Sequence, residues 1–238
     1  MRFLFLGRKA VAAEALRYLH NAGHEAIVVA QPDDVLWETA EHLKIAAVTE
    51  DNIYRGELGG IDAVISFLYW KKIREPLLSC AKIGAFNFHS APLPQSRGRG
   101  GINFAILEDR KTYGSSIHWM DATFDTGDLV EVKHFPLAPE ETALSLERKA
   151  QALLLDMFKS FIARLDCGET IPRHPQGAGG PTITTQDMLD AMEVRIGDSP
   201  ELTARRVRAF WYPPRTGAML MVNGKKYTLV DEVTLKSL

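Results

Sequence analysis

The sequence has little cysteine, little excess charge and no long apolar run. Its two cysteines, Cys80 and Cys167, lie far apart and form no CxxC pair, which argues against a disulfide scaffold and suits a reducing compartment. Lys and Arg number 28 against 30 Asp and Glu, a balance that gives no electrostatic basis for binding long nucleic acid. The first residues, MRFLFLGRKAV, have their charges wrongly placed for a signal peptide. We therefore expect a soluble, cytoplasmic protein that binds neither nucleic acid nor membranes.

Two sequence motifs that would point to a bound cofactor are also missing. The first turn, LGRKAV, is not GxGxxG, and this weakens the case for a nicotinamide-dependent enzyme. No HxxxH or ligand-type carboxylate cluster occurs, and most histidines are scattered, so no metal is expected. His118 lies within a strand pattern, and we interpret it as structural.

Strand-like runs alternate with helical patterns over the first two-thirds of the chain. This alternation predicts an α/β fold, a Rossmann-like and mostly parallel sheet with helices between its strands. The most regular helical spacing lies in residues 143–165 and ends at Gly168. We expect strands at 1–7, 25–32, 45–48, 61–69, 84–90, 114–121 and 129–137, and further helices at 10–22, 37–43 and 102–110.

Residues 171–182, IPRHPQGAGGPT, are rich in proline and glycine and are the best candidate for a domain boundary. We expect a catalytic domain over residues 1–170 and a small C-terminal α+β appendage over 171–238. The appendage should contain helices near 184–192 and 200–210 and a β-hairpin, because Asn-Gly at 223–224 favours a type I′ turn. Exposed edges of this hairpin could pair across a twofold axis and make a homodimer.

The stretch FNFHSAPLPQSRG, residues 86–98, carries the chemistry that we consider first. Asn87 and His89 are two places apart on a strand and so share one face, at the carboxyl end where open α/β sheets bind ligands. Alone, Asn87 could cap a turn and His89 could be a satisfied core histidine. Two neighbouring features favour a site: the turn FDTGDL, where Asp125 could polarise an imidazole, and the loop SAPLPQSRGRGG, whose glycines let the backbone approach a ligand.

These residues occur in an order that resembles the formyltransferases that use 10-formyltetrahydrofolate. The resemblance is carried by Asn87-Phe88-His89, Leu93-Pro94, Arg97-Gly98, Phe104-Ala105-Ile106-Leu107, Tyr113-Gly114, Ile117-His118 and Asp125-Thr126-Gly127. It covers about residues 1–165 and is strongest over 83–130. His89 and Asp125 are separated as the catalytic His and Asp of that family are.

The resemblance implies an enzyme with 10-formyltetrahydrofolate as co-substrate. Asn87 would donate to the oxyanion, His89 would accept the proton of the attacking amine, and Asp125 would steady the imidazolium. The segment SFLYWKKI would line the folate pocket, facing a wall at 121–125. The residues expected to bind the folate are Leu68, Tyr69, Trp70, Ile73 and Asp121, although the aromatic ones could equally be core packing.

The acceptor implied by the resemblance is the amine of a dTDP- or GDP-linked amino-dideoxy sugar, as in O-antigen synthesis. The stretch RVRAFWYPPRTGAMLMVNGKKY, residues 206–227, is similar to the sugar N-formyltransferases, whereas a tail without excess basic charge disfavours the tRNA enzymes. RGRGG replaces the more usual RG-x-NG, which leaves the sugar open. A formyltransferase for another small amine, such as glycinamide ribonucleotide, and a non-catalytic folate- or nucleotide-binding module are the alternatives.

A nucleotide-linked sugar carries a pyrophosphate, so cations near the strand ends are candidate contacts, although each could be a solvated surface charge. They are Arg8, Lys71, Lys72, Arg97 and Arg99. Trp211 and Tyr212 could stack on the base or sugar, or could fasten the tail to the main domain.

Overall fold

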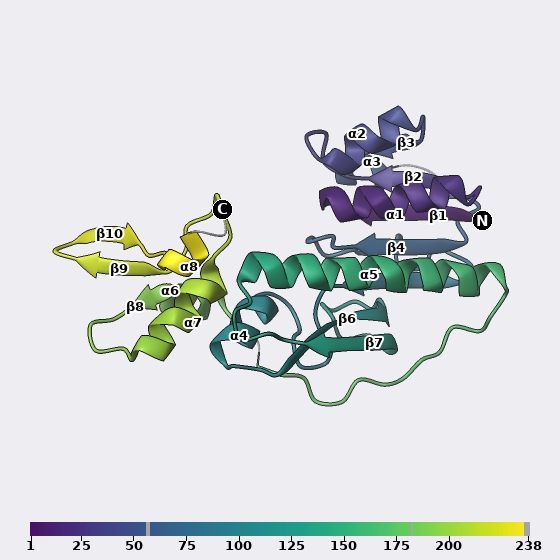
Figure 1. Ribbon diagram of the computed structural model, residues 1–238. Helices are drawn as coiled ribbons and strands as arrows, with labels where there is room; N and C mark the ends of the chain where they lie inside the picture. Colours follow the sequence, from purple (N-terminus) through teal and green to yellow (C-terminus); the bar gives the residue numbers. More distant parts are fainter. Residues whose placement is uncertain (56–57, 182, 236–238) are drawn as a thin grey trace.

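The structure is a computed structural model that describes residues 1–55, 58–181 and 183–235. A seven-stranded sheet with the order β3-β2-β1-β4-β5-β6-β7 forms its centre, and a three-stranded sheet, β10-β9-β8, lies beyond one end of it (Figure 1). The strands are β1 (Arg2–Gly7), β2 (Glu25–Val29), β3 (Ala46–Val48), β4 (Ala63–Phe67), β5 (Gly84–His89), β6 (Thr112–Trp119), β7 (Leu129–Pro136), β8 (Glu193–Val194), β9 (Met219–Val222) and β10 (Lys225–Thr228). The helices are α1 (Lys9–Asn21), α2 (Val35–His42), α3 (Glu50–Ile53), α4 (Gly101–Leu107), α5 (Ala143–Asp166), α6 (Thr185–Met192), α7 (Pro200–Phe210) and α8 (Glu232–Leu235).

The first five strands of the large sheet run parallel, and β6 and β7 continue it antiparallel. The central strands are apolar on both faces, as in the fully buried run Phe3–Leu6 of β1, and this composition is typical of strands covered on both sides. The mostly parallel Rossmann-like sheet that the sequence predicts is thereby confirmed. The expected strand 61–69 is shorter, because the chain turns out of β4 at Leu68, which adopts a φ of 55°.

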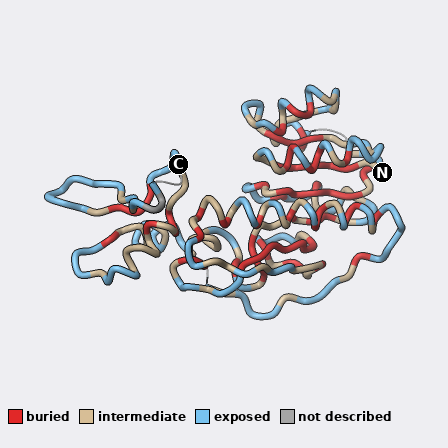
Figure 2. Tube along the Cα trace, viewed as in Figure 1, coloured by how far each residue is buried: buried red, intermediate tan, exposed pale blue. Residues whose placement is uncertain are grey.

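One face of the sheet is covered by α1 and α5, which lie side by side across it (Figure 1). A capping box between Thr142 and Ser145 starts α5, and its apolar stripe buries Phe158 and Phe161 against Phe67, Phe86 and Phe88. The other face is covered by Ile53 at the end of α3 and by the loop after β4, including Tyr69, Ile73 and Leu77. The long helix predicted at 143–165 is therefore the principal cover of the core, which Figure 2 shows in red along the large sheet.

The C-terminal part contains the hairpin that the sequence predicts. Asn223 and Gly224 both have positive φ, at 48° and 76°, and join β9 to β10, as a type I′ turn requires. A third strand, β8, pairs parallel with β9 and was not expected. Much of the hairpin is exposed (Figure 2). Within the described residues, none of the helices combines the length and apolarity needed to cross a bilayer.

Residues 171–180 return from the end of α5 along β7 instead of leaving the main sheet (Figure 1). The main-chain N–H and C=O groups of His174 both bond to Leu129, at 3.0 and 2.8 Å, and Gly180 N donates to Pro94 O at 3.1 Å. We call residues 171–180 the strap. The boundary at 170 remains a prediction, but the start of the expected appendage packs against the catalytic part of the chain.

Candidate active site

Strand β5 ends with two polar side chains on one face. Its residues alternate, so that Phe86 and Phe88 are fully buried against α5 while Asn87 and His89 are only half-buried on the opposite side. This is the period of two that the sequence indicated. Strand β5 runs parallel to β4, so the carboxyl ends of both strands lie at the same edge of the sheet. Open α/β sheets bind their ligands at this edge.

Asp125 approaches the same place from the turn between β6 and β7. It is 8% exposed and adopts a φ of 55°, a left-handed conformation that Asp tolerates better than most residues. Its Oδ1 accepts from Asn87 Nδ2 at 3.2 Å and its Oδ2 accepts from the Gly98 amide at 2.9 Å. Oδ2 lies 3.9 Å from His89 Nδ1, too far for a direct hydrogen bond but close enough for ion pairing or one bridging water.

Asp125 is ionised at neutral pH. Burial by itself would raise the pKa of its carboxyl, but the charge of His89, the contact with His118 and the Gly98 amide together outweigh burial and hold that pKa well below its usual range. A fixed negative charge therefore faces the His89 ring.

The contacts of His89 fix which of its nitrogens can act as a base. Nε2 lies 2.9 Å from the main-chain oxygen of Ser96, and because a carbonyl only accepts, Nε2 carries the proton. In the neutral ring Nδ1 is then unprotonated, and it is the nitrogen nearest Asp125. His89 is thus arranged to accept a proton at Nδ1 and to share the resulting positive charge with the carboxylate.

His118 belongs to this cluster, although the sequence suggested a structural role. It lies opposite Asn87 in the antiparallel pair of β5 and β6, is 2% exposed, and donates from Nδ1 to Trp119 O at 2.7 Å. In the neutral ring Nε2 therefore accepts from Asn87 Nδ2 at 2.9 Å, and in the protonated ring the same nitrogen pairs with Asp125 Oδ1, which lies 3.4 Å away. The two amide protons of Asn87 are shared between His118 and Asp125, and the bond to Asp125 is the longer.

A cleft of about 340 Å³ lies between the loop after β4 and Met120–Ala122, the segment that precedes the Asp125 turn. Two of the residues expected to bind folate, Ile73 and Asp121, line it together with Lys72. The other lining residues are Arg74, Glu75, Leu78, Met120 and Ala122. Its volume is within the range of about 300–1,000 Å³ for small-molecule sites, and the segments on its two sides are those that the sequence named as the walls of a folate pocket.

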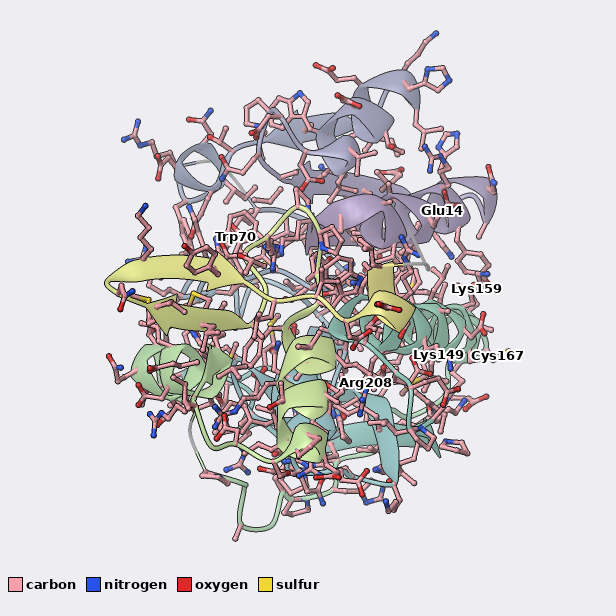
Figure 3. All side chains as sticks on the ribbon, turned by 60° about the vertical axis from the view of Figure 1, so that its left-hand side comes forward. Glu14, Trp70, Lys149, Lys159, Cys167 and Arg208 are labelled. Atoms are coloured by element: carbon pink, nitrogen blue, oxygen red, sulfur yellow. The ribbon has the colours of Figure 1, made fainter. Side chains whose placement is uncertain are left out.

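The remaining residues expected in the folate pocket have different surroundings. Tyr69 is 9% exposed and packs in the core between the sheet and the following loop. Leu68 packs against the main core and offers its carbonyl to Arg8 Nε at 3.0 Å. Trp70, labelled in Figure 3, is 42% exposed. Of these three, Trp70 is the most exposed, and Tyr69 lies against its ring, with the two ring centres 5.0 Å apart.

Most of the expected phosphate contacts are engaged within the protein. The Arg8 guanidinium lies 5.1 Å from the centre of the Trp70 ring, and Lys71 pairs with Glu50 at 2.6 Å. Arg97 donates to Gln176 and to Gly177 O of the strap, and Arg99 donates to Thr185 at 3.1 Å. Lys72 is exposed at the cleft. Arg8, Lys71 and Lys72 lie in the turns after β1 and β4, whereas Arg97 and Arg99 connect the site loop to the strap and to α6.

The chain at Trp211 and Tyr212 is held to α5, and binding of the base or sugar by either ring remains a prediction. Trp211 O accepts from Leu144 N at 3.1 Å, and the Tyr212 hydroxyl donates to Glu147 on α5. Burial and the hydrogen bond to Glu147 raise the pKa of Tyr212 to about 12, so the hydroxyl keeps its proton at neutral pH. Lys9 Nζ also bonds Glu147, at 2.7 Å.

A family model described as "Formyl transferase" matches residues 30–158, more than half of the chain and the part that contains Asn87, His89 and Asp125. The chain belongs to the formyl transferase family. A curated methionyl-tRNA formyltransferase from Thermotoga neapolitana is 29% identical over 258 residues, covering 100% of this chain and 80% of that protein. The family expected from the sequence is thus confirmed, and with it the enzyme class.

Two solved structures are similar to this formyl transferase over most of its length. A 4-N formyltransferase from Francisella tularensis has a TM-score of 0.84 at 15% identity and covers 97% of both chains. An N-formyltransferase from Helicobacter canadensis, in complex with folinic acid and dTDP-3-aminofucose, has a TM-score of 0.74 at 18% identity and covers 93% of this chain and 84% of that one. At these identities the likeness establishes the fold alone.

Proposed function

We propose that this formyl transferase moves the formyl group of 10-formyltetrahydrofolate to the amino group of a nucleotide-linked amino-dideoxy sugar. The observation that carries the chemistry is the convergence of Asn87, His89 and Asp125 at the carboxyl end of β5. The donor supplies an activated formyl carbon. The protein has to bind the donor, stabilise negative charge on the formyl oxygen and take one proton from the amine.

The chain's own groups are suited to each of these tasks. The cleft between Ile73 and Asp121 would hold the pterin ring of the donor. Asn87 Nδ2 makes two hydrogen bonds, and the longer one is to Asp125. The N–H of this longer bond would donate to the formyl oxygen instead as negative charge develops there. His89 Nδ1 would take the proton that the amine loses when its nitrogen bonds to the formyl carbon, and Asp125 would stabilise the imidazolium. As the carbon–nitrogen bond to the donor breaks, the leaving nitrogen takes up the proton that His89 Nδ1 holds, and His89 returns to its neutral form.

The nucleotide-linked sugar is favoured over other amines by the C-terminal part of the chain. The Francisella tularensis 4-N formyltransferase aligns over 97% of both chains, and the Helicobacter canadensis neighbour is in complex with dTDP-3-aminofucose. Residues 171–238 carry nine Lys and Arg against seven Asp and Glu, a small excess for binding a tRNA backbone. Arg8 and Lys72 are our candidate contacts for the pyrophosphate, and Trp70 for a ring.

A second candidate acceptor is methionyl-tRNA, because the curated relative from Thermotoga neapolitana is similar over the whole of this chain. Formyl transfer to methionyl-tRNA would use the same Asn87, His89 and Asp125. The two candidates differ in the surface that recognises the acceptor and are separated only by assay.

The test is turnover with 10-formyltetrahydrofolate, followed as release of tetrahydrofolate. The acceptors are dTDP-, GDP- and UDP-linked amino sugars, methionyl-tRNA and glycinamide ribonucleotide. We expect turnover with a nucleotide-linked sugar, and a loss of at least about 100-fold in His89→Asn. His134→Asn, which changes an exposed histidine on β7, is the matched control and should keep the full rate. Turnover with methionyl-tRNA or glycinamide ribonucleotide alone would overturn the sugar assignment, and an active His89→Asn would overturn the mechanism.

A further inference from the structure

The strap lies against the turn that carries Asp125. Trp119 Nε1 donates to Pro172 O at 2.8 Å, and Arg173 lies 3.6 Å from the centre of the Trp119 ring. With the His174 and Gly180 hydrogen bonds already described, the strap is tied at both ends to strands and loops of the active site. It therefore brings one further side chain, that of Gln176, to a fixed position beside the catalytic turn.

Gln176 is half-buried, and both ends of its carboxamide are used. Nε2 donates to two main-chain oxygens of the catalytic turn, those of Asp125 at 3.1 Å and of Gly127 at 2.6 Å. Oε1 accepts from Arg97 Nε at 3.1 Å and from Arg97 Nη2 at 2.9 Å. A carboxamide has two N–H donors and one oxygen acceptor, so these contacts occupy both kinds of group, and they fix which end of the amide faces the turn.

The two segments that Gln176 connects are the two that hold the catalytic carboxylate. One is the turn itself, in which Asp125 has the left-handed φ of 55° that a non-glycine residue keeps only when its surroundings impose it. The other is the loop of Arg97 and Gly98, whose Gly98 amide donates to Asp125 Oδ2. Gln176 thus supports Asp125 in two ways: directly, through the main chain of the turn, and through Arg97, whose neighbour Gly98 binds the carboxylate. Gln176 lies outside residues 30–158, the part of the chain that the family model matches.

We propose that Gln176 is a positioning residue for formyl transfer. Its two N–H donors hold the main chain of the Asp125 turn so that the carboxylate stays at its ion-pairing distance from His89 Nδ1. Because a displacement of about 1 Å in a catalytic group can cost about 10²-fold in rate, loss of this brace should lower kcat by about 10- to 100-fold. The KM for the formyl donor should change little, since Gln176 is not among the residues that line the cleft.

Two substitutions separate the two ends of the amide. Gln176→Ala removes both sets of contacts. Gln176→Glu keeps an oxygen for Arg97, and with it a charge-assisted pair, but has no N–H to give the carbonyls of Asp125 and Gly127. We expect Gln176→Glu to lose at least as much kcat as Gln176→Ala. The matched control is His174→Ala, because His174 belongs to the same strap but is exposed and bonds Leu129 through its main chain.

The experiment has one arm that needs no acceptor. Hydrogen–deuterium exchange on the free protein should show faster exchange of the amides in residues 124–128 and at Gly98 in both Gln176 variants, by about tenfold or more. The amides of β6 and the thermal midpoint should stay as in the wild type and in His174→Ala. Unchanged exchange in the turn would overturn the proposal, as would faster exchange throughout β6 and α5.

The kinetic arm uses whichever acceptor the wild type turns over. A Gln176→Glu variant with wild-type kcat would also overturn the proposal, because the Arg97 contact alone would then suffice. This proposal rests on the proposed function, but the two can fail separately. If neither the wild type nor His174→Ala formylates a nucleotide-linked sugar, the proposed acceptor is wrong, and hydrogen–deuterium exchange still tests the role of Gln176.

Discussion

Asp125→Asn is the substitution that most directly tests the role of charge in the active site. It removes one negative charge and leaves a side chain of nearly the same shape, whose oxygen can still accept from the Gly98 amide. Asn also tolerates the left-handed φ of 55° found at this position. The variant should therefore fold as the wild type does, with the carboxylate's effect on His89 removed.

The size of that effect follows from the distance between the two groups. Asp125 Oδ2 lies 3.9 Å from His89 Nδ1, at a site where Asp125 is 8% exposed. Two unit charges at this separation attract by about 4 kcal/mol at an effective dielectric constant of about 20. The imidazolium that forms when His89 takes the amine proton would lose this stabilisation, which corresponds to about three orders of magnitude in rate.

The assay is kcat/KM for formyl transfer, with circular dichroism and the thermal midpoint measured on the same preparations. We expect a loss of about 10²- to 10⁴-fold at neutral pH in a protein that is folded as the wild type is. A folded Asp125→Asn enzyme within about threefold of the wild-type rate would refute the assignment of Asp125 as the group that stabilises the imidazolium.

Three further predictions concern stability. Gly127→Ala should lower the free energy of unfolding, measured in urea, by at least about 1–3 kcal/mol, because the added Cβ would overlap the main chain of β6. Gly177→Ala is the control, because a Cβ at Gly177 meets open space. Equal losses of unfolding free energy in the two variants would contradict this packing. Tyr212→Phe should cost about 1.5–3 kcal/mol, because it removes the hydrogen bond to Glu147, and an unchanged urea midpoint would mean that the hydroxyl does not fasten the tail. Folding lowers the pKa of Asp125, so the ionised carboxylate stabilises the folded protein. This stabilisation is complete at pH values well above about 4, the pKa of an ordinary Asp, and is lost as the pH falls toward the lowered pKa of the folded state. The difference in unfolding free energy between wild type and Asp125→Asn should therefore change progressively as the pH falls below about 5, and a difference that stays constant from pH 5 down to pH 3 would contradict it.

The sequence predicts those parts of the site that depend on local periodicity. The alternation of a strand places Asn87 and His89 on one face whatever lies around them, and the alternation of strands and helices places that strand in a mostly parallel sheet. Asp125 was a candidate from its turn alone, but its spacing from His89 was informative only through the resemblance to the formyltransferases, because nothing local relates the turn after β6 to the end of β5.

The rest of the site depends on tertiary structure. His118 joins the cluster because β6 pairs antiparallel with β5 and brings it opposite Asn87, and a strand pattern gives no register with its neighbour. Gln176 lies in a stretch that the sequence marks only as proline- and glycine-rich, and its role depends on the path of the strap. The structure shows that the guanidinium groups of Arg97 and Arg99 contact Gln176 and Thr185, whereas their binding of an anion remains a prediction, because charge alone does not identify the partner.

The most direct test of the central claim is a crystal structure of the protein with 5-formyltetrahydrofolate and a nucleotide-linked amino sugar. We expect the pterin in the cleft lined by Ile73 and Asp121, and the formyl oxygen within about 3 Å of Asn87 Nδ2. The sugar amine should lie within about one water molecule's reach of His89 Nδ1. A well-ordered formyl group bound away from Asn87 and His89, with the amine directed elsewhere, would contradict the claim that these residues and Asp125 carry out formyl transfer.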